Sequence, residues 1–429
     1  MIFTNSQKVN QFSEKHIKAG IHKTRILTEL ITGILLCHGK RTFEALSKVL
    51  LDNQKNKTSV RSFFETENFR SRDILKDAIR SVIIETARLC EPSGLYVFLF
   101  DGTCIQRGGD TLVKNAIKYR AKKQRKKGKR STKAHSFTMG LLLLPNGTRI
   151  PIPRYSYYSR KYCRETKTCY YTQHEIACMM IEYVRSLVPE TAEFYVIADG
   201  FYDSKIIFDT CKRKNAIYVT CADSGRVYEP KKKLYERGLE KKEDAKTLII
   251  KKGEEKYTRE HNRYASQSGK KKTDVYKYES EKLKFPKLGE LQIVYSWKMS
   301  KGKKKSESYK ILLCNGKEVS ARKIIELYAL RWQIEIYFRE LKSELGLCDY
   351  AGKSFIAQER FIDVCLLTYL FLEWNRKEHL KIVYSQKEKA KIKKSRSKGL
   401  IILFKKECIE ETKYKLSEIF LQYNIQRVA

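Results

Sequence analysis

Two apolar runs that each lead into an Asp-Gly pair constrain the fold of this chain most strongly. The segments LYVFLFDG (95–102) and FYVIADG (194–200) are rich in aromatic and β-branched residues. Short continuous runs of this composition are typical of strands buried on both faces of a sheet. We therefore expect two strands of one sheet, with Asp101 and Asp199 at their carboxyl ends, where functional groups of such sheets are found.

Each acid taken alone also has a purely structural explanation. Asp-Gly is a frequent turn pair, and Asp199 can cap a helix that follows it. Two strands of one sheet that end in the same way favour a shared pocket.

The remaining segments alternate between strand and helix patterns. HSFTMGLLLLPNGTRIPIPRYSYY (135–158) predicts a hairpin with its turn at Pro145-Asn146-Gly147. Helix and strand patterns alternate from there to residue 222, which predicts a mixed α/β sheet. Residues 226–308 are dense in Lys and Glu and contain strand-like pieces such as ELQIVYSW. They predict an inserted, mostly β subdomain.

This pattern divides the chain into four parts. We expect a helical domain at 1–90, an α/β core at 91–225 and 309–375, a β-rich insertion at 226–308, and a basic helical C-terminal region at 376–429.

The charge balance indicates a polyanionic partner. The 429 residues include 88 Lys and Arg against 49 Asp and Glu, a net charge of +39, whereas solubility requires only about 2 to 8 charges on a small domain. Nucleic acid is the leading partner, and an anionic membrane surface is the alternative. We find no apolar run near the ~20 residues that span a bilayer and no signal-peptide pattern, so we expect a cytoplasmic protein without a membrane partner.

Two basic segments are candidate DNA contacts. HGKRTFEALSKVLL and NKTSVRSFFET predict two helices with the layout of a helix-turn-helix, whose second helix carries Lys57 and Arg61. A plain helical hairpin explains the same pattern. Residues 114–133 contain 11 Lys or Arg and no acid, which is typical of a solvated loop or of a phosphate-binding surface. The candidate contacts in this run are Lys122, Lys123, Arg125, Lys126 and Lys127.

A third acid lies in the predicted helix ELYALRWQIEIYFRELKSELGL (326–347). At about 100° per residue, one face of this helix carries four polar residues within an arc of about 60°. They are Tyr328, Arg331, Glu335 and Lys342. An ion pair between Arg331 and Glu335 at i, i+4 spacing explains part of this arrangement. It does not explain why the other two residues share the arc.

Three converging carboxylates raise one another's pKa unless a cation lies among them. Oxygen ligands select hard ions such as Mg²⁺ or Mn²⁺. Two such ions about 3.5–4 Å apart stabilise the attacking and leaving oxygens of a displacement at phosphorus. If Asp101, Asp199 and Glu335 meet, we expect them to bind two Mg²⁺ ions, with Mn²⁺ able to substitute, and to cut or join a nucleic-acid backbone.

At these residues the sequence resembles the DDE transposases of bacterial insertion sequences. The motifs FDGT at Asp101 and DGFY at Asp199 match that family, as does the long separation between Asp199 and Glu335. The group of these transposases with a tyrosine–arginine–glutamate–lysine signature is matched in full. The matching residues are Tyr328, Arg331, Glu335 and Lys342.

The resemblance implies a ribonuclease H-like core in which Asp101, Asp199 and Glu335 bind two divalent metals. It further implies cut-and-paste movement in the bacterial cytoplasm, on the nucleoid. A homodimer would hold the terminal inverted repeats of double-stranded DNA, hydrolyse one strand and use the freed 3′-hydroxyl for strand transfer, with a hairpin intermediate and without a nucleotide cofactor.

By the same resemblance, three residues of the helix would contact phosphates: Tyr328, Arg331 and Lys342. Trp297 in IVYSWKM is a candidate to stack on a flipped base, with a place in the core as the alternative. Two other functions remain open, namely a ribonuclease H-like nuclease or resolvase without strand transfer, and a domesticated, non-catalytic DNA-binding protein.

Overall fold

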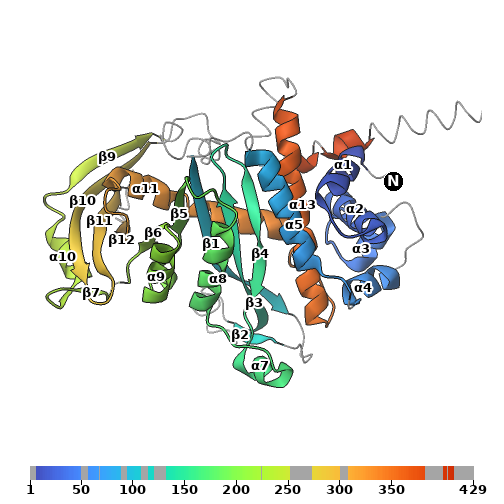
Figure 1. Cartoon of the computed structure of the whole chain (residues 1–429), viewed down its shortest axis with the longest axis horizontal. Coiled ribbons are helices and arrows are strands. Elements are labelled where there is room, and N and C mark those ends of the chain that lie inside the picture. Colours follow the sequence, from blue (N-terminus) through green and yellow to red (C-terminus); the bar gives the residue numbers. More distant parts are fainter. Residues whose placement is uncertain are drawn as a thin grey trace, which may run out of the picture.

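The computed structural model of the chain describes residues 6–49, 57–66, 68–87, 94–107, 115–119, 132–223, 225–251, 273–299, 308–381, 400–402 and 404–409. Within this part, one sheet of ten strands has the order β2-β3-β1-β5-β6-β12-β11-β10-β9, with β4 paired to β3. Helices precede and follow the sheet along the chain (Figure 1). The mixed α/β class predicted from the sequence is confirmed.

The centre of the sheet contains both apolar runs as neighbouring strands. β1 (Leu95–Arg107) is parallel to β5 (Glu193–Ile197) and antiparallel to β3 (Thr132–Leu143). β5 is in turn parallel to β6 (Ile217–Cys221). The side chains from Tyr96 to Phe100 are all buried, as expected of a central strand that helices cover on both faces.

The predicted hairpin is present. β3 pairs antiparallel with β4 (Arg149–Ser156), and Gly147 adopts a positive φ of 77° in the turn, a conformation that glycine takes without steric cost. The short strand β2 (Ile117–Tyr119) pairs with β3 at Thr132–Ala134, on the same edge as β4 and opposite to β1.

The strands of the expected insertion continue the same sheet. β12 (Ser308–Cys314) pairs with β6, and the sheet then runs through β11 (Gly289–Met299), β10 (Thr273–Phe285) and β9 (Lys246–Lys251). β6 needs a hydrogen-bonding partner on its outer edge, and β12 provides one. A ribbon of β7 (Val227–Tyr228) and β8 (Lys232–Lys233) and the helix α10 (Leu234–Glu240) complete this region. The division into four domains stays a prediction.

Helices cover both faces of the sheet. In Figure 1, α8 (Gln173–Arg185) and α9 (Lys205–Arg213) lie in front of it, and α11 (Ala321–Ala329) and the orange ribbon that follows pass behind it. α7 (Arg160–Thr166) lies beyond β2. Among the described residues, no helix combines the length and apolar character that crossing a membrane requires.

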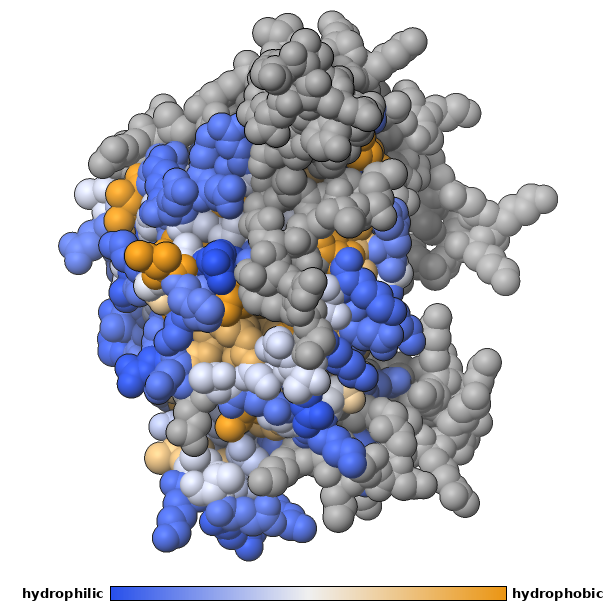
Figure 2. All heavy atoms as spheres, turned by 90° about the vertical axis from the view of Figure 1, so that its right-hand side faces the viewer, coloured by the Kyte–Doolittle hydropathy of each residue, from blue (hydrophilic) through white to orange (hydrophobic). Residues whose placement is uncertain are grey.

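The N-terminal helices pack around one long C-terminal helix. They are α1 (Gln7–His16), α2 (Ile21–Leu36), α3 (Phe43–Val49), α4 (Lys57–Glu65) and α5 (Ser71–Ala87). α13 (Phe355–Lys381) contacts four of them and also β4. Figure 2 faces this helical end and shows hydrophilic side chains over much of the coloured surface, with smaller hydrophobic patches between them.

The helix-turn-helix is only partly described. Thr42 caps α3, since its hydroxyl accepts a hydrogen bond from the Ala45 N–H at 3.1 Å. The connection at residues 50–56 lies outside the described residues, so the turn of the motif stays a prediction.

Candidate active site

Asp101 and Asp199 occupy matching positions on two neighbouring strands. In the parallel pairing of β1 and β5, Leu99 is opposite Ile197. Each acid follows two residues later, and Asp199 keeps an extended backbone with φ −80° and ψ 176°. Because neighbouring strands are about 4.8 Å apart, the two acids lie side by side.

The two acids differ in their local structure. Asp199 follows the end of β5 and caps the 3₁₀ helix η1 (Gly200–Tyr202), accepting a hydrogen bond from the Phe201 N–H at 3.0 Å. Asp101 does not end its strand, because β1 continues to pair with the longer β3 as far as Arg107. The prediction that both acids end a strand is therefore wrong for Asp101.

The Asp101 side chain points to the face of the sheet that α12 covers. Ile105 lies on the same side of β1 as Asp101, since side chains alternate along a strand. Its cross-strand partner His135 hydrogen-bonds to Gln358 of α13. α12 (Trp332–Ser343) contacts both β1 and β3 on this face.

The single helix predicted at 326–347 is divided between two helices. α11 ends at Ala329 and α12 begins at Trp332. Between them, the Arg331 N–H donates to the carbonyl oxygen of Tyr328 at 3.1 Å, a three-residue step. The break lets α11 pack on β6, β11 and β12 while α12 packs on β1 and β3. The four polar residues therefore do not share one face of one continuous helix.

Glu335 lies in the first turn of α12 and forms an ion pair with Arg331. The distance from Arg331 Nη2 to Glu335 Oε1 is 2.6 Å, and the side chains are 18% and 34% exposed. This confirms the i, i+4 pairing that the sequence suggested.

The pKa of Asp101 depends on the charges of Asp199, Glu335 and Arg331, so these residues lie near its carboxylate. Burial raises the pKa of Asp101 to about 6, and the negative charges of Asp199 and, to a smaller extent, Glu335 act in the same direction. The Gly102 N–H, which donates to Asp101 Oδ1 at 2.7 Å, and the Arg331 guanidinium oppose this increase. The positive charge of Arg331 thus lies close to the carboxylates of Asp101 and Glu335.

Tyr328 and Lys342 lie at opposite ends of this region. Tyr328 is 8% exposed, and burial raises its pKa, with Cys221 and Asp199 acting in the same direction. The ammonium group of Lys310 lies 5.1 Å from the Tyr328 ring centroid. Lys342 is half-buried; burial raises the pKa of Cys104, and the positive charge of Lys342 opposes this increase.

In the described part of the chain, the three acids are not arranged as a preformed metal site. Among the described residues, no group of three or more His, Cys, Asp or Glu side chains is placed to hold a metal ion. The Glu335 carboxylate is turned to Arg331 instead. Even so, the raised pKa of Asp101 fits a cation site, because repulsion between carboxylates falls when a cation binds among them.

The predicted DNA contacts differ in their surroundings. Lys57 and Arg61 are exposed on α4, where Arg61 Nε lies 3.0 Å from Glu65 Oε1. Trp297 is 2% exposed and stacks on Tyr309 with ring centroids 5.2 Å apart. This burial contradicts its expected role as a base platform and places it in the core. The five contacts predicted in the basic run lie outside the described residues: Lys122, Lys123, Arg125, Lys126 and Lys127.

Two hydrogen-bond donors that were not predicted hold the turn after Asp199 in place. The Thr220 hydroxyl donates to the Asp199 carbonyl oxygen at 2.8 Å, and the Tyr218 hydroxyl donates to the Tyr202 carbonyl oxygen at 2.9 Å. Both donors come from β6. Alternation along the segment AIYVTCA gave no sign that two of its polar groups would face this turn.

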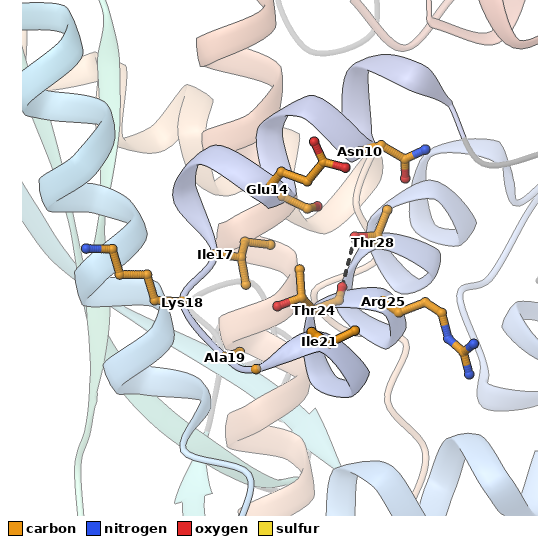
Figure 3. A pocket seen from close by; sticks show the side chains of 11 residues that line it. Asn10, Glu14, Ile17, Lys18, Ala19, Ile21, Thr24, Arg25 and Thr28 are labelled. Carbon is orange, nitrogen blue, oxygen red and sulfur yellow. Dashed lines mark hydrogen bonds between the residues drawn. The ribbon is translucent and has the colours of Figure 1, made fainter.

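A separate pocket of about 560 Å³ lies between α1 and α2, away from these acids (Figure 3). Glu14 of α1 and Thr28 of α2 line it, while Lys18 and Arg25 point in opposite directions. It shares no residue with the acid cluster.

Comparison with known proteins identifies the domain that contains two of the three acids. Residues 161–371 match the family model described as the transposase DDE domain. The match includes Asp199 and Glu335 but begins after Asp101, whose assignment depends on its position beside Asp199. A search of curated proteins found no match. Residues 161–371 of this chain thus belong to the transposase DDE domain family.

Proposed function

We propose that this protein moves a DNA element by metal-dependent cut-and-paste transposition. It hydrolyses strands at terminal inverted repeats and joins the freed 3′-hydroxyl to target DNA, with a hairpin intermediate. The observation that carries the proposal is the register of Asp101 beside Asp199 on parallel strands, together with the charge of Glu335 acting on Asp101.

The three acids are proposed as the ligands of two divalent metal ions, Mg²⁺ or Mn²⁺. Their oxygen-only donor set suits hard cations. When bound, such ions stabilise negative charge on the oxygens that attack and leave phosphorus. Asp101 and Asp199 hold one side of the site on rigid strands, and Glu335 approaches from α12.

Three further side chains are proposed to hold phosphates beside the acids. Arg331 can form two parallel hydrogen bonds to a phosphate, and Lys342 supplies a point charge. The Tyr328 hydroxyl stays protonated, because burial raises its pKa, and can donate to a phosphate oxygen.

The N-terminal helices are proposed to bind double-stranded DNA through Lys57 and Arg61, and the basic run at 114–133 to bind phosphates without regard to sequence. A homodimer would hold both element ends at once. The site of action would be the bacterial nucleoid.

Cleavage by acid variants tests the proposal. Asp101→Asn, Asp199→Asn and Glu335→Gln should each keep DNA affinity and lose Mg²⁺-dependent nicking of a duplex that carries an element end. Asp209→Asn is a matched control, because this carboxylate is exposed on α9 and paired with Lys205. Nicking by any of the three variants at the rate of the unchanged protein would remove that residue from the site.

Strand transfer needs its own measurement. A pre-cut end with a free 3′-hydroxyl, supplied with a supercoiled plasmid and Mg²⁺, should become joined to the plasmid. Nicking without joining would contradict transposition and indicate a nuclease of the same chemistry.

A further inference from the structure

A buried arginine, Arg149, forms an ion pair with the helix α12 that carries Glu335. Arg149, the first residue of β4, has its Nη2 3.5 Å from Glu340 Oε2 of α12, and the side chains are 1% and 9% exposed. The Tyr369 hydroxyl of α13 donates to the same carboxylate oxygen at 3.4 Å. Glu340 therefore connects α12 to a strand and to a second helix.

The same arginine also fixes α13. Its backbone N–H donates to Glu373 Oε2 at 3.1 Å, and its Nε lies 3.7 Å from Glu373 Oε1. Arg376, one turn further along α13, lies 3.4 Å from Glu373 and donates to the Gly147 carbonyl oxygen in the hairpin turn at 3.2 Å. We call these four charged residues the Arg149 network: Arg149, Glu340, Glu373 and Arg376.

A network this deeply buried is not explained by stability alone. The cost of removing charges from water offsets much of their attraction, so buried ion pairs add little net stability. Their best-attested use is to fix the register of packed elements, because a shift leaves a buried charge without its partner.

Geometry relates this register to the acids. Glu340 follows Glu335 by five residues, which is about 7.5 Å along the axis of α12 and about 140° around it. Glu335 thus faces Asp101 from one side of α12, while Glu340 contacts Arg149 on nearly the opposite side. A rotation or slide of α12 that displaced Glu335 would also separate Glu340 from Arg149.

We propose that Arg149 and Glu340 are positioning residues for the Glu335 carboxylate. Their ion pair fixes the rotation and axial position of α12 relative to β4 and α13. This inference rests on the proposed function, in which Glu335 is a metal-binding acid.

The other end of β4 offers a matched control. Arg154 pairs with Glu359 at 2.9 Å and with Asp363 at 3.1 Å, and the three side chains are 1–12% exposed. These acids lie on α13, so this second buried pairing joins β4 to α13 in the same way but involves no residue of α12.

The test compares Glu340→Gln with Glu359→Gln in the full chain. Urea unfolding measures stability, electron paramagnetic resonance measures Mn²⁺ binding without DNA, and single-turnover nicking at saturating DNA measures the rate constant. Glu340→Gln should lower Mn²⁺ affinity and the rate constant about ten- to hundredfold with DNA affinity unchanged. Glu359→Gln should lose similar stability while Mn²⁺ affinity and nicking stay near those of the unchanged protein.

A conservative pair separates positioning from folding. Arg149→Lys keeps a positive charge and should retain more of the nicking rate than Arg149→Met at equal folded fraction. Equal losses of rate in Glu340→Gln and Glu359→Gln, or full Mn²⁺ binding and nicking by folded Glu340→Gln, would overturn the inference and leave the proposed function standing. An unchanged protein that neither binds Mn²⁺ nor nicks DNA would instead overturn the proposed function.

Discussion

The Arg331 guanidinium donates a hydrogen bond to the Glu335 carboxylate across 2.6 Å and also opposes the increase in the pKa of Asp101. One monovalent side chain thus compensates part of the negative charge that a divalent ion would compensate more fully. If Glu335 binds a metal ion as proposed, the metal and Arg331 compete for its carboxylate, and a phosphate that attracted Arg331 away would favour the metal.

Arg331→Gln should therefore have opposite effects on metal binding and on cleavage. Without DNA, its Mn²⁺ affinity should rise several-fold, because Glu335 is freed and a positive charge is removed. Nicking should fall, because the proposed phosphate contact is lost. Lys342→Gln is the control for the metal affinity alone, since it removes a positive charge that has no ion pair with Glu335 among the described residues. An unchanged Mn²⁺ affinity in Arg331→Gln would show that the two cations do not compete.

The ionised carboxylate of Asp101 should destabilise the metal-free protein. Its folded pKa of about 6 lies above the usual value of 3.8, so the cost is absent below about pH 3.8 and complete above about pH 6. Asp101→Asn removes it and should raise the free energy of unfolding at neutral pH by about 1 to 3 kcal/mol. Urea unfolding in EDTA at neutral and acidic pH measures this.

The pH dependence and a control variant test the prediction for Asp101→Asn. The gain in Asp101→Asn should disappear as the pH falls through the range between the two pKa values. Asp209→Asn, on an exposed carboxylate, should show no comparable gain at neutral pH. A variant that is no more stable than the unchanged protein in EDTA would mean that Asp101 is better solvated than its burial indicates.

A buried histidine should make stability fall in weak acid. His16 of α1 is fully buried, and its Nδ1 lies 2.8 Å from the Ser81 hydroxyl. Burial lowers the pKa of His16 from 6.5 to about 4, although the charge of Glu85 acts in the opposite direction. The unfolded chain then binds a proton that the folded protein does not, so stability is complete above about pH 6.5 and is lost as the pH falls toward 4.

The loss between about pH 7.5 and pH 5 should be about 2 kcal/mol from this residue. His16→Gln should flatten the difference between the two pH values in urea unfolding, even if it lowers stability at both. His174→Gln is the control, because that imidazole is on the surface of α8. An equal pH dependence in His16→Gln and the unchanged protein would contradict a neutral buried imidazole.

The pair of central strands could be predicted because their signal is local. Composition alone indicated that 95–100 and 194–198 are buried strands, and parallel neighbours place the acids that follow them side by side. The break between α11 and α12 has no local signal, since no Gly or Pro lies at Leu330 or Arg331. It arises from packing, because the two helices lie on different strands of the sheet.

Contacts between residues far apart in the sequence determined three further features that could not be predicted locally. The strand-like pieces at 226–308 predicted a separate β subdomain, but the edge of β6 pairs with β12, and the central sheet continues from there through β11, β10 and β9. Trp297 has the exposure of a core residue because Tyr309 of the neighbouring strand covers its ring. The Arg149 network connects residues more than 190 positions apart, a separation at which no spacing rule applies.

The two glycines that follow the acids should respond differently to substitution. A Cβ at Gly102 would meet only the Tyr202 hydroxyl at 3.7 Å, whereas a Cβ at Gly200 would lie 3.1 Å from the backbone carbonyl oxygen of Cys221. Gly102 also lies inside β1, where a larger residue reduces the entropy of the unfolded chain. Gly102→Ala should therefore stabilise the protein by about 0.4–1 kcal/mol. Gly200→Ala should destabilise it, because the backbone of β6 must move, and should reduce nicking by displacing Asp199. Urea unfolding of both variants measures the sign of each change in the free energy of unfolding. Equal changes would mean that the turn after Asp199 accommodates a Cβ at Gly200 without destabilising the fold.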